Sequence, residues 1–275
     1  MTDLKYKLII ADYDGTLTIG ETVPPETVEA IAEFRKAGGK FVLCSGRTPE
    51  SAFRRMEENR IECDAIAACQ GSIIKVGEKI VLQEGLTAEQ FYRIAKGIDD
   101  EFHRDFITYT NETLYCSGDG KECTGYMQWS AEPRKEKLEH IYDLAQMYPD
   151  NKFAKLLVMK GKEEDVDAIY DYIEKKFPAE VVANSGGYTI LEIVSSKYTK
   201  YDACRIITEM LGVKESETIT IGDSTNDFPL LDFGWALAPE NAKPGLKKKA
   251  RRVVEHVNER PVEKIIKRLL AGENP

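Results

Sequence analysis

The sequence predicts an α/β fold with a mainly parallel sheet, into which a second, α+β domain is inserted. Two observations lead to this prediction. Between residues 7 and 69, short apolar runs alternate with helical stretches, which is the pattern of βαβ units. After residue 83 this alternation gives way to paired strands and helices, and it returns near residue 191. We therefore assign 1–83 and 191–275 to the core and 84–190 to the inserted domain.

The first core segment is expected to hold three strands joined by two helices. The predicted strands are 8–11, 40–44 and 65–69, and the predicted helices are 25–37 and 49–57. The strands are apolar throughout, as in parallel sheets that are covered on both faces. Pro25 at the start of the first helix and Gly38 after its end fit the preferences of helix termini. A hairpin over 72–82 that turns at Gly77 closes the segment.

The inserted domain and the second core segment have their own patterns. In the insertion we expect a helix at 87–100, two β runs within 106–116, helical stretches within 121–147, a strand at 153–159, a helix at 163–176 and strands near 181 and 188–194. In the second core segment we expect helices at 200–211, 226–231 and 260–270 and strands at 218–221 and 235–237.

Composition narrows the classes of function. The chain has 275 residues, a net charge of -9, 42% hydrophobic and 31% charged residues, which is typical of a globular protein. The negative charge argues against general binding to nucleic acid or to anionic membranes. No apolar run approaches the ~20 residues of a membrane span, and none before Asp12 suits a signal peptide. The lack of such segments leads us to expect a cytoplasmic protein. The six cysteines contain no CxxC pair, and several lie within apolar runs, which favours buried reduced thiols over a zinc or disulfide framework.

Four polar motifs stand at predicted strand ends or helix starts. They are DYDGT from Asp12, SGR from Ser45, a lysine at Lys200, and GDSTND from Gly222 to Asp227. Ligands of open parallel sheets bind at the carboxyl ends of the strands. We therefore expect the four motifs to meet at one edge of the sheet.

The acids among them indicate a metal ion. Asp12, Asp14, Asp223 and Asp227 would repel one another in a dry crevice unless a cation neutralised them. Carboxylate oxygens without histidine or thiolate partners favour Mg²⁺. Asp223 and Asp227 are four residues apart at a helix start, so both can face one ion.

The other polar groups suit an anion. Ser45 and Gly46 offer a hydroxyl and backbone N–H groups at a strand-to-helix turn. Lys200 supplies a mobile positive charge and Asn226 a neutral donor. A metal site beside such donors is the arrangement that holds a phosphoryl group for in-line attack.

The pair of acids after the first strand then has a chemical interpretation. Asp12 can act as nucleophile and take the phosphoryl group as an aspartyl-phosphate. Asp14 can protonate the leaving oxygen and later deprotonate the attacking water. Gly15 permits the tight turn, and Thr16 can bond to its local backbone. A calcium loop is the alternative for this segment, but an EF-hand needs a helix where a buried strand precedes Asp12.

The motifs DYDGTLT, SGR, a lysine before a helix and GDSTND, in this order, resemble the four motifs of the haloacid dehalogenase superfamily of phosphohydrolases. The inserted domain resembles the cap of its Cof-type (sugar phosphatase) subfamily. The resemblance implies a Rossmann-like core, with a cap that determines substrate specificity. It also implies Mg²⁺ on Asp12, the Asp14 carbonyl and Asp223, with Asp227 supporting the metal site.

The resemblance extends to further positions. It implies that Ser45, Gly46, Lys200 and Asn226 contact phosphate, with Lys197 as the competitor of Lys200. Asn241 matches a subfamily position near the site. The sequence departs from the subfamily at three places, which are Gln70 in place of an asparagine, Tyr201 in place of a glycine, and the closing segment NERPVEKI.

The resulting hypothesis is a Mg²⁺-dependent phosphatase that hydrolyses a small phosphorylated metabolite. We expect a monomer or homodimer without nucleic-acid or membrane partners. One alternative is a phosphosugar mutase, because phosphomannomutases resemble this motif set. The other is a catalytically idle binding protein that keeps the fold.

Overall fold

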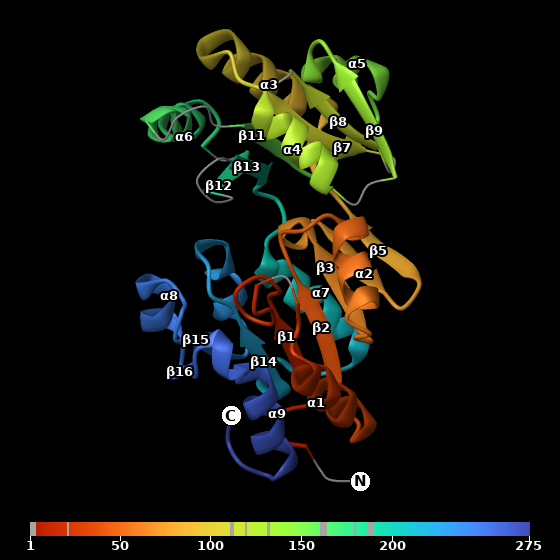
Figure 1. Cartoon of the computed structure of the whole chain (residues 1–275), viewed down its shortest axis with the longest axis vertical. Helices are drawn as coiled ribbons and strands as arrows, with labels where there is room; N and C mark the ends of the chain where they lie inside the picture. Colours follow the sequence, from red (N-terminus) through yellow and green to blue (C-terminus); the bar gives the residue numbers. More distant parts are fainter. Residues whose placement is uncertain are drawn as a thin grey trace. The chain divides into compact units, whose positions relative to one another are not determined.

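The computed structural model describes residues 4–20, 22–110, 113–118, 120–130, 133–159, 164–178, 180–185 and 190–275. The chain forms two compact units, which are Met1–Leu82 with Tyr198–Pro275, and Gln83–Lys197 (Figure 1). The chain returns to the first unit after Lys197 and not near the expected residue 190. The reason is that strand β13 (Ile190–Ser195) pairs with strands of the inserted unit.

The first unit is built on an eight-stranded sheet in the order β16-β15-β14-β1-β2-β3-β4-β5. Its strands are β1 (Leu8–Ala11), β2 (Lys40–Cys44), β3 (Ala65–Ala68), β4 (Ile73–Val76), β5 (Lys79–Gln83), β14 (Thr218–Ile221), β15 (Trp235–Pro239) and β16 (Arg252–Val254). The strands from β16 to β3 run parallel, and β4 is antiparallel to β3. Strand β1 lies where the two halves of the chain meet, which is the switch point at which such sheets bind ligands.

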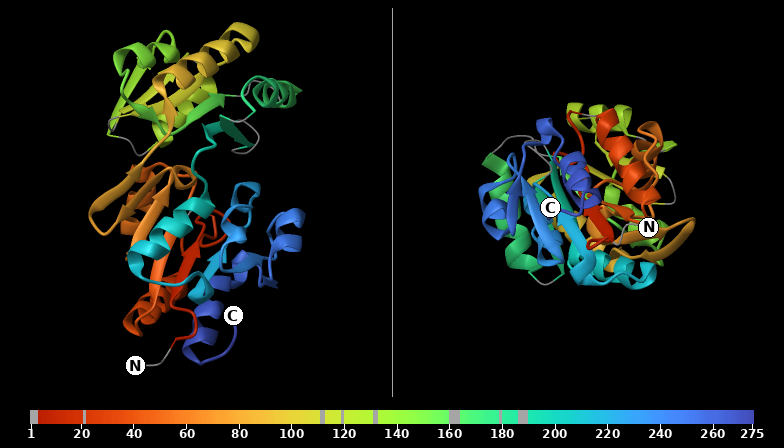
Figure 2. Two further views of the ribbon diagram at one scale, coloured as in Figure 1. Left: turned by 180° about the vertical axis from the view of Figure 1, so that it is seen from behind. Right: turned by 90° about the horizontal axis from the view of Figure 1, so that it is seen from below.

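Helices cover both faces of this sheet (Figure 2). They are α1 (Pro25–Lys36), α2 (Pro49–Glu58), α7 (Lys200–Leu211), α8 (Pro244–Lys249) and α9 (Pro261–Leu270). Ile9 and Ala11 of β1 belong to the core formed with α1, α2 and α9, whereas Leu8 and Ile10 belong to the core formed with α7 and α8. Alternate residues of a strand point to opposite faces, so burial of both faces explains the uninterrupted apolar run of β1.

One predicted helix of the core is wrong in type. The segment 226–231 forms two short 3₁₀ helices, Thr225–Asp227 and Leu230–Asp232. Pro229 lies between them and has no N–H to continue a helical ladder. The motif GDSTND therefore ends in a tight turn, in which the Asp227 side chain accepts from the backbone N–H groups of Asp223 and Ser224.

The inserted unit contains a six-stranded sheet in the order β12-β13-β11-β7-β8-β9. Its remaining strands are β7 (Phe106–Thr110), β8 (Thr113–Ser117), β9 (Arg134–Leu138), β11 (Leu156–Met159) and β12 (Val181–Ser185), with a separate pair β6 (Leu86–Thr87) and β10 (Lys152–Phe153). Its helices are α3 (Ala88–Phe102), α4 (Lys121–Trp129), α5 (Leu144–Met147) and α6 (Glu164–Lys176).

The core of the inserted unit joins α3 and α6 to one face of this sheet. Phe91 and Phe153 stack there with ring centroids 4.0 Å apart. Strand β9 was not predicted, because its sequence RKEKL is charged and exposed and so carries no apolar alternation. The expected strand at 188–194 begins at residues outside the described ones.

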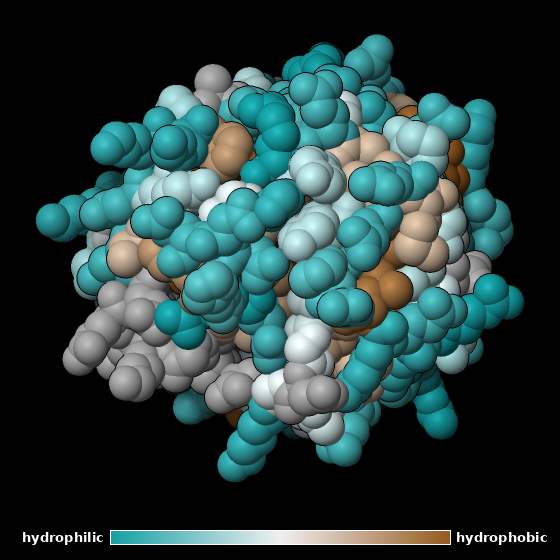
Figure 3. All heavy atoms as spheres, turned by 90° about the horizontal axis from the view of Figure 1, so that it is seen from above, coloured by the Kyte–Doolittle hydropathy of each residue, from teal (hydrophilic) through white to brown (hydrophobic). Residues whose placement is uncertain are grey.

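Among the described residues, no helix combines the length and the apolar character that crossing a membrane requires. The face drawn in Figure 3 carries mainly hydrophilic side chains, with apolar ones scattered among them. Single apolar residues of this kind are normal at a protein surface.

Candidate active site

Asp12 follows β1 at the carboxyl edge of the core sheet. Its N–H donates to the carbonyl of Ile221 on the neighbouring strand β14 at 2.9 Å, which fixes the backbone there. The chain then turns, since the carbonyl of Tyr13 accepts from the N–H of Leu17 at 3.0 Å. As a result the Asp12 side chain is buried, whereas that of Asp14, in the turn, is 55% exposed.

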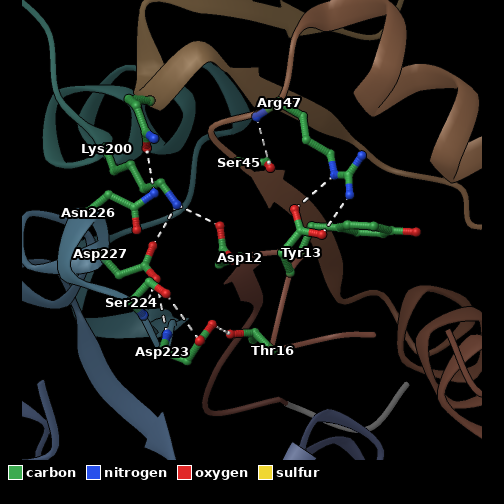
Figure 4. Close-up of polar contacts among 12 residues, drawn as sticks. Asp12, Tyr13, Thr16, Ser45, Arg47, Lys200, Asp223, Ser224, Asn226 and Asp227 are labelled. Atoms are coloured by element: carbon green, nitrogen blue, oxygen red, sulfur yellow. Dashed lines mark hydrogen bonds and ion pairs between the residues drawn. The ribbon is translucent and has the colours of Figure 1, made fainter. Parts of the chain in front are cut away.

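Lys200 lies between two of the predicted acids (Figure 4). Its Nζ donates to Oδ1 of Asp12 at 2.6 Å and to Oδ1 of Asp227 at 2.5 Å, and its side chain is fully buried. Helix α7 begins at this lysine because Thr199 and Asp202 cap it reciprocally. Lys197, the competitor, forms an ion pair with Glu84 and is 59% exposed. The structure therefore brings Lys200 to the acids, whereas Lys197 pairs with Glu84 within the inserted unit.

Asp223 and Asp227 are held by hydrogen bonds to neighbouring backbone and to Thr16 of the first core segment. Oδ2 of Asp227 accepts from the backbone N–H groups of Asp223 and Ser224, both at 3.0 Å. Oδ1 of Asp223 accepts from the Thr16 hydroxyl at 2.9 Å. Both oxygens of Asp227 are thus engaged by Lys200 and the backbone, whereas the oxygens of Asp223 accept from the hydroxyls of Thr16 and Ser224.

Three carboxylates converge, because Asp12, Asp223 and Asp227 each offer an oxygen within 4.8 Å of the others. Burial, the charge of Asp227 and those of the other acids raise the pKa of Asp12 well above its usual value, against the opposing effect of Lys200. Burial and Asp227 raise the pKa of Asp223 to about 6. One lysine does not neutralise three acids, so the cluster has room for a cation that binds hard oxygen ligands.

The Asp14 carboxylate lies outside this cluster and forms a bidentate ion pair with Arg47. The Nε and Nη2 atoms of Arg47 lie 2.8 and 2.6 Å from the two oxygens of Asp14. The guanidinium also lies over the Tyr13 ring at 5.1 Å and donates to Ser51. In the sequence, Arg47 stands out only as part of SGR, although an arginine two residues after a predicted phosphate ligand is a usable signal.

The predicted phosphate contacts also lie at this edge of the sheet. Ser45 is buried directly after β2, and its Oγ accepts from the Arg47 N–H at 3.2 Å. Nδ2 of Asn226 donates to Oε1 of Gln70 at 3.2 Å, and the Gln70 side chain packs against Gly46. Gln70, noted in the sequence only as a departure, is therefore a residue of the site.

Asn241 has a structural role in the loop after β1. Its Nδ2 donates to the Gly15 carbonyl at 2.8 Å, and its Oδ1 accepts from the Val257 N–H at 2.9 Å. Asn241 therefore fixes the turn that follows Asp12 and Asp14.

Two curated relatives of this chain are phosphatases by name. The chain is 26% identical to the 5-amino-6-(5-phospho-D-ribitylamino)uracil phosphatase YwtE of Bacillus subtilis, over 97% of this chain and 99% of the relative. It is 25% identical to a phosphoglycolate phosphatase of Pyrobaculum aerophilum, over 90% of this chain and 89% of the relative.

Among solved structures, a haloacid dehalogenase-like hydrolase from Bacteroides thetaiotaomicron matches with a TM-score of 0.83 at 21% identity, covering 96% of this chain and 100% of that one. The predicted α/β fold and the expected phosphatase type of hydrolase are confirmed. The model of the haloacid dehalogenase-like hydrolases matches residues 9–266, so the chain belongs to this family.

Proposed function

We propose that the protein is a Mg²⁺-dependent phosphatase that hydrolyses a small phosphorylated metabolite through an aspartyl-phosphate at Asp12. The observation that carries this proposal is the buried contact of Asp12 with Lys200 beside Asp223. Lys200 fixes this carboxylate, but further acids surround it. It can react with an anionic phosphoryl group only if a cation offsets the negative charge of these acids.

The donor set fits Mg²⁺. Asp12 and Asp223 would hold the ion, since their oxygens are close together and the side-chain donors to Asp223 in the described part of the chain are the neutral hydroxyls of Thr16 and Ser224. Asp227 would support them by holding Lys200 and the backbone at Asp223. When bound, Mg²⁺ supplies positive charge that offsets the acids and stabilises the phosphoryl group.

Asp12 is the proposed nucleophile. Lys200 fixes Oδ1 of Asp12, which leaves the second oxygen to attack phosphorus in line with the leaving oxygen. The phosphoryl group would be surrounded by Lys200, Asn226, the Ser45 hydroxyl and the N–H of Gly46. Figure 4 shows Ser45, Lys200 and Asn226 around Asp12, and Gly46 follows Ser45 in the chain.

Asp14 is the proposed acid and base. It donates a proton to the leaving oxygen of the substrate and later takes one from the water that hydrolyses the aspartyl-phosphate. Arg47 holds both oxygens of Asp14 in the present arrangement, so Arg47 determines where this carboxyl group stands before substrate binds.

The relatives support a class of substrate. One is named for a phosphorylated ribitylaminouracil and another for phosphoglycolate, which share only a phosphomonoester on a small molecule. The net charge of -9 agrees with a small substrate rather than nucleic acid.

The test is phosphate release from a panel of phosphorylated metabolites and p-nitrophenyl phosphate, each with Mg²⁺ and with EDTA. We expect release that depends on Mg²⁺ and is lost in D12N. Release without metal would contradict the metal assignment. If no substrate releases phosphate, a hexose bisphosphate is added next. Interconversion of hexose phosphates would then favour the mutase, and its absence would favour an idle binding protein.

A further inference from the structure

The segment that follows β3 has an unusual backbone. Cys69, Gln70 and Gly71 have φ values of 50°, 61° and 98°, so three consecutive residues occupy the left-handed region. Glycine adopts this region freely, but cysteine and glutamine do so at a cost in free energy. Gln70 is also 6% exposed. Residues kept in such a conformation at a candidate site often have a function there.

The strained backbone holds the turn that carries Ser45 and Gly46. The Gln70 N–H donates to the Ser45 carbonyl at 3.1 Å, and the Cys69 N–H donates to the Arg47 carbonyl at 2.9 Å. In a planar trans peptide the carbonyl and the following N–H point in opposite directions. The N–H of Gly46 therefore points away from the 69–71 segment, because the carbonyl of Ser45 points toward it.

The Gln70 side chain holds a second predicted phosphate ligand. Its Oε1 accepts from Nδ2 of Asn226 at 3.2 Å. Oδ1 of Asn226 is buried and has no hydrogen-bond partner in the described part of the chain. The bond to Gln70 is therefore the contact that orients this carboxamide, and it leaves the second Nδ2 hydrogen of Asn226 for another acceptor.

Two glycines make room for this arrangement. A Cβ on Gly46 would lie 2.4 Å from Nε2 of Gln70, so the glutamine occupies the space that a side chain at residue 46 would take. A Cβ on Gly71 would lie 2.5 Å from the carbonyl of Thr199, the residue before Lys200. The 69–71 segment thus packs against both the Ser45 turn and the start of α7.

We propose that Gln70 is a positioning residue of the phosphate site, which sets the direction of the Gly46 N–H through its backbone and that of the Asn226 carboxamide through its side chain. This inference rests on the proposed function. Its role is to arrange donors around the transferred phosphoryl group, so it affects binding of that group and not the nucleophile itself.

The test separates the backbone of Gln70 from its side chain. Q70G keeps the left-handed backbone and removes the carboxamide, and Q70N restores a carboxamide in a residue that tolerates positive φ. R60G is the matched control, because Arg60 is an exposed residue of the same unit with φ 55°. All variants are compared with the wild type in Mg²⁺ by the KM and kcat for p-nitrophenyl phosphate, by the inhibition constant of orthophosphate, and by Tm.

We expect Q70G to raise both the KM and the orthophosphate inhibition constant about tenfold, which corresponds to the loss of one hydrogen bond. The kcat should change much less, because the lost contact serves the bound and the reacting phosphoryl group alike. The Tm of R60G should stay the same or rise, since glycine relieves the strain. In Q70G this gain is offset by the loss of the hydrogen bond to the Asn226 side chain. Q70N should recover at least half of the lost affinity.

A Q70G enzyme with wild-type KM and orthophosphate inhibition would overturn the inference. So would a fall in kcat alone, a matching loss of affinity in R60G, or no recovery in Q70N. These results are distinct from failure of the proposed function, in which the wild type itself would release no phosphate or D12N would remain active.

Discussion

Replacing Lys200 with methionine tests the electrostatic account of the site. K200M keeps the length and much of the apolar volume of the side chain but removes its charge. The Lys200 side chain is fully buried, and Asp12 and Asp227 beside it are 7% and 0% exposed. K200M therefore leaves two buried carboxylates without the cation that now lies 2.6 and 2.5 Å from them.

The expected loss of stability follows from this burial. Removing one partner of a buried ion pair costs about 3–5 kcal/mol, because the remaining charge is desolvated and uncompensated. The metal-free K200M protein should lose about this much free energy of unfolding near neutral pH. K197M is the matched control, since the exposed pair of Lys197 and Glu84 should contribute at most about 1 kcal/mol.

Low pH and Mg²⁺ should both reduce the loss of stability in K200M. The folded protein raises the pKa of Asp12 and Asp223, so these carboxyl groups take up protons before they would in the unfolded chain. Stability is therefore gained as pH falls through the raised pKa values, and the gain is larger when Lys200 is absent. Mg²⁺ should likewise stabilise K200M more than the wild type, because it replaces the missing charge.

The assay is urea unfolding followed by circular dichroism, with EDTA or Mg²⁺, near pH 7 and near pH 5. A loss in K200M no larger than that in K197M would refute the account. So would a large loss that neither acid nor Mg²⁺ reduces, since that would reflect packing rather than charge.

Three further predictions concern the same edge of the sheet. The pKa of Asp223 is about 6, so a proton competes with Mg²⁺ for this carboxylate near that pH. The rise in Tm that Mg²⁺ causes, measured by scanning fluorimetry, should therefore shrink as pH falls through about 6. A rise in Tm that does not change with pH would contradict this prediction. R47K should lower kcat about tenfold with a small change in Tm, because lysine cannot hold both oxygens of Asp14. An unchanged kcat in steady-state kinetics would show that Arg47 has no part in the reaction. G15A should lower the free energy of unfolding by at least about 1 kcal/mol, because φ of Gly15 is +79°. It should also weaken Mg²⁺ binding, because the new Cβ would lie 2.6 Å from Oδ2 of Asp223. A wild-type affinity for Mg²⁺ in isothermal titration calorimetry would contradict this prediction.

The sequence was informative about features that depend on the order of residues within one strand or turn. The apolar run of β1 predicted a strand covered on both faces, and the motifs at strand ends predicted that Asp12, Ser45 and Asp223 lie at one edge of the sheet. Both inferences need only the period of a strand and the geometry of parallel sheets, which hold regardless of the rest of the chain.

The sequence was less informative where contacts join distant residues. The bond of Gln70 to Asn226 spans 156 positions and depends on a left-handed backbone that glutamine does not favour by itself. The choice between Lys197 and Lys200 depended on which lysine becomes buried against Asp12. Burial and strain of this kind arise from tertiary packing, so composition and periodicity do not encode them.

The most direct test of the central claim is to find the phosphoryl group on Asp12. The D14N enzyme, which should form the aspartyl-phosphate from an activated aryl phosphate but hydrolyse it slowly, is quenched in acid during turnover and digested for mass spectrometry. The account predicts that the peptide containing Asp12 gains the mass of one phosphoryl group, and that this gain is absent in the D12N/D14N double variant. Phosphate release by the wild type with no phosphorylated Asp12 peptide in D14N, or with the label on another residue, would contradict it.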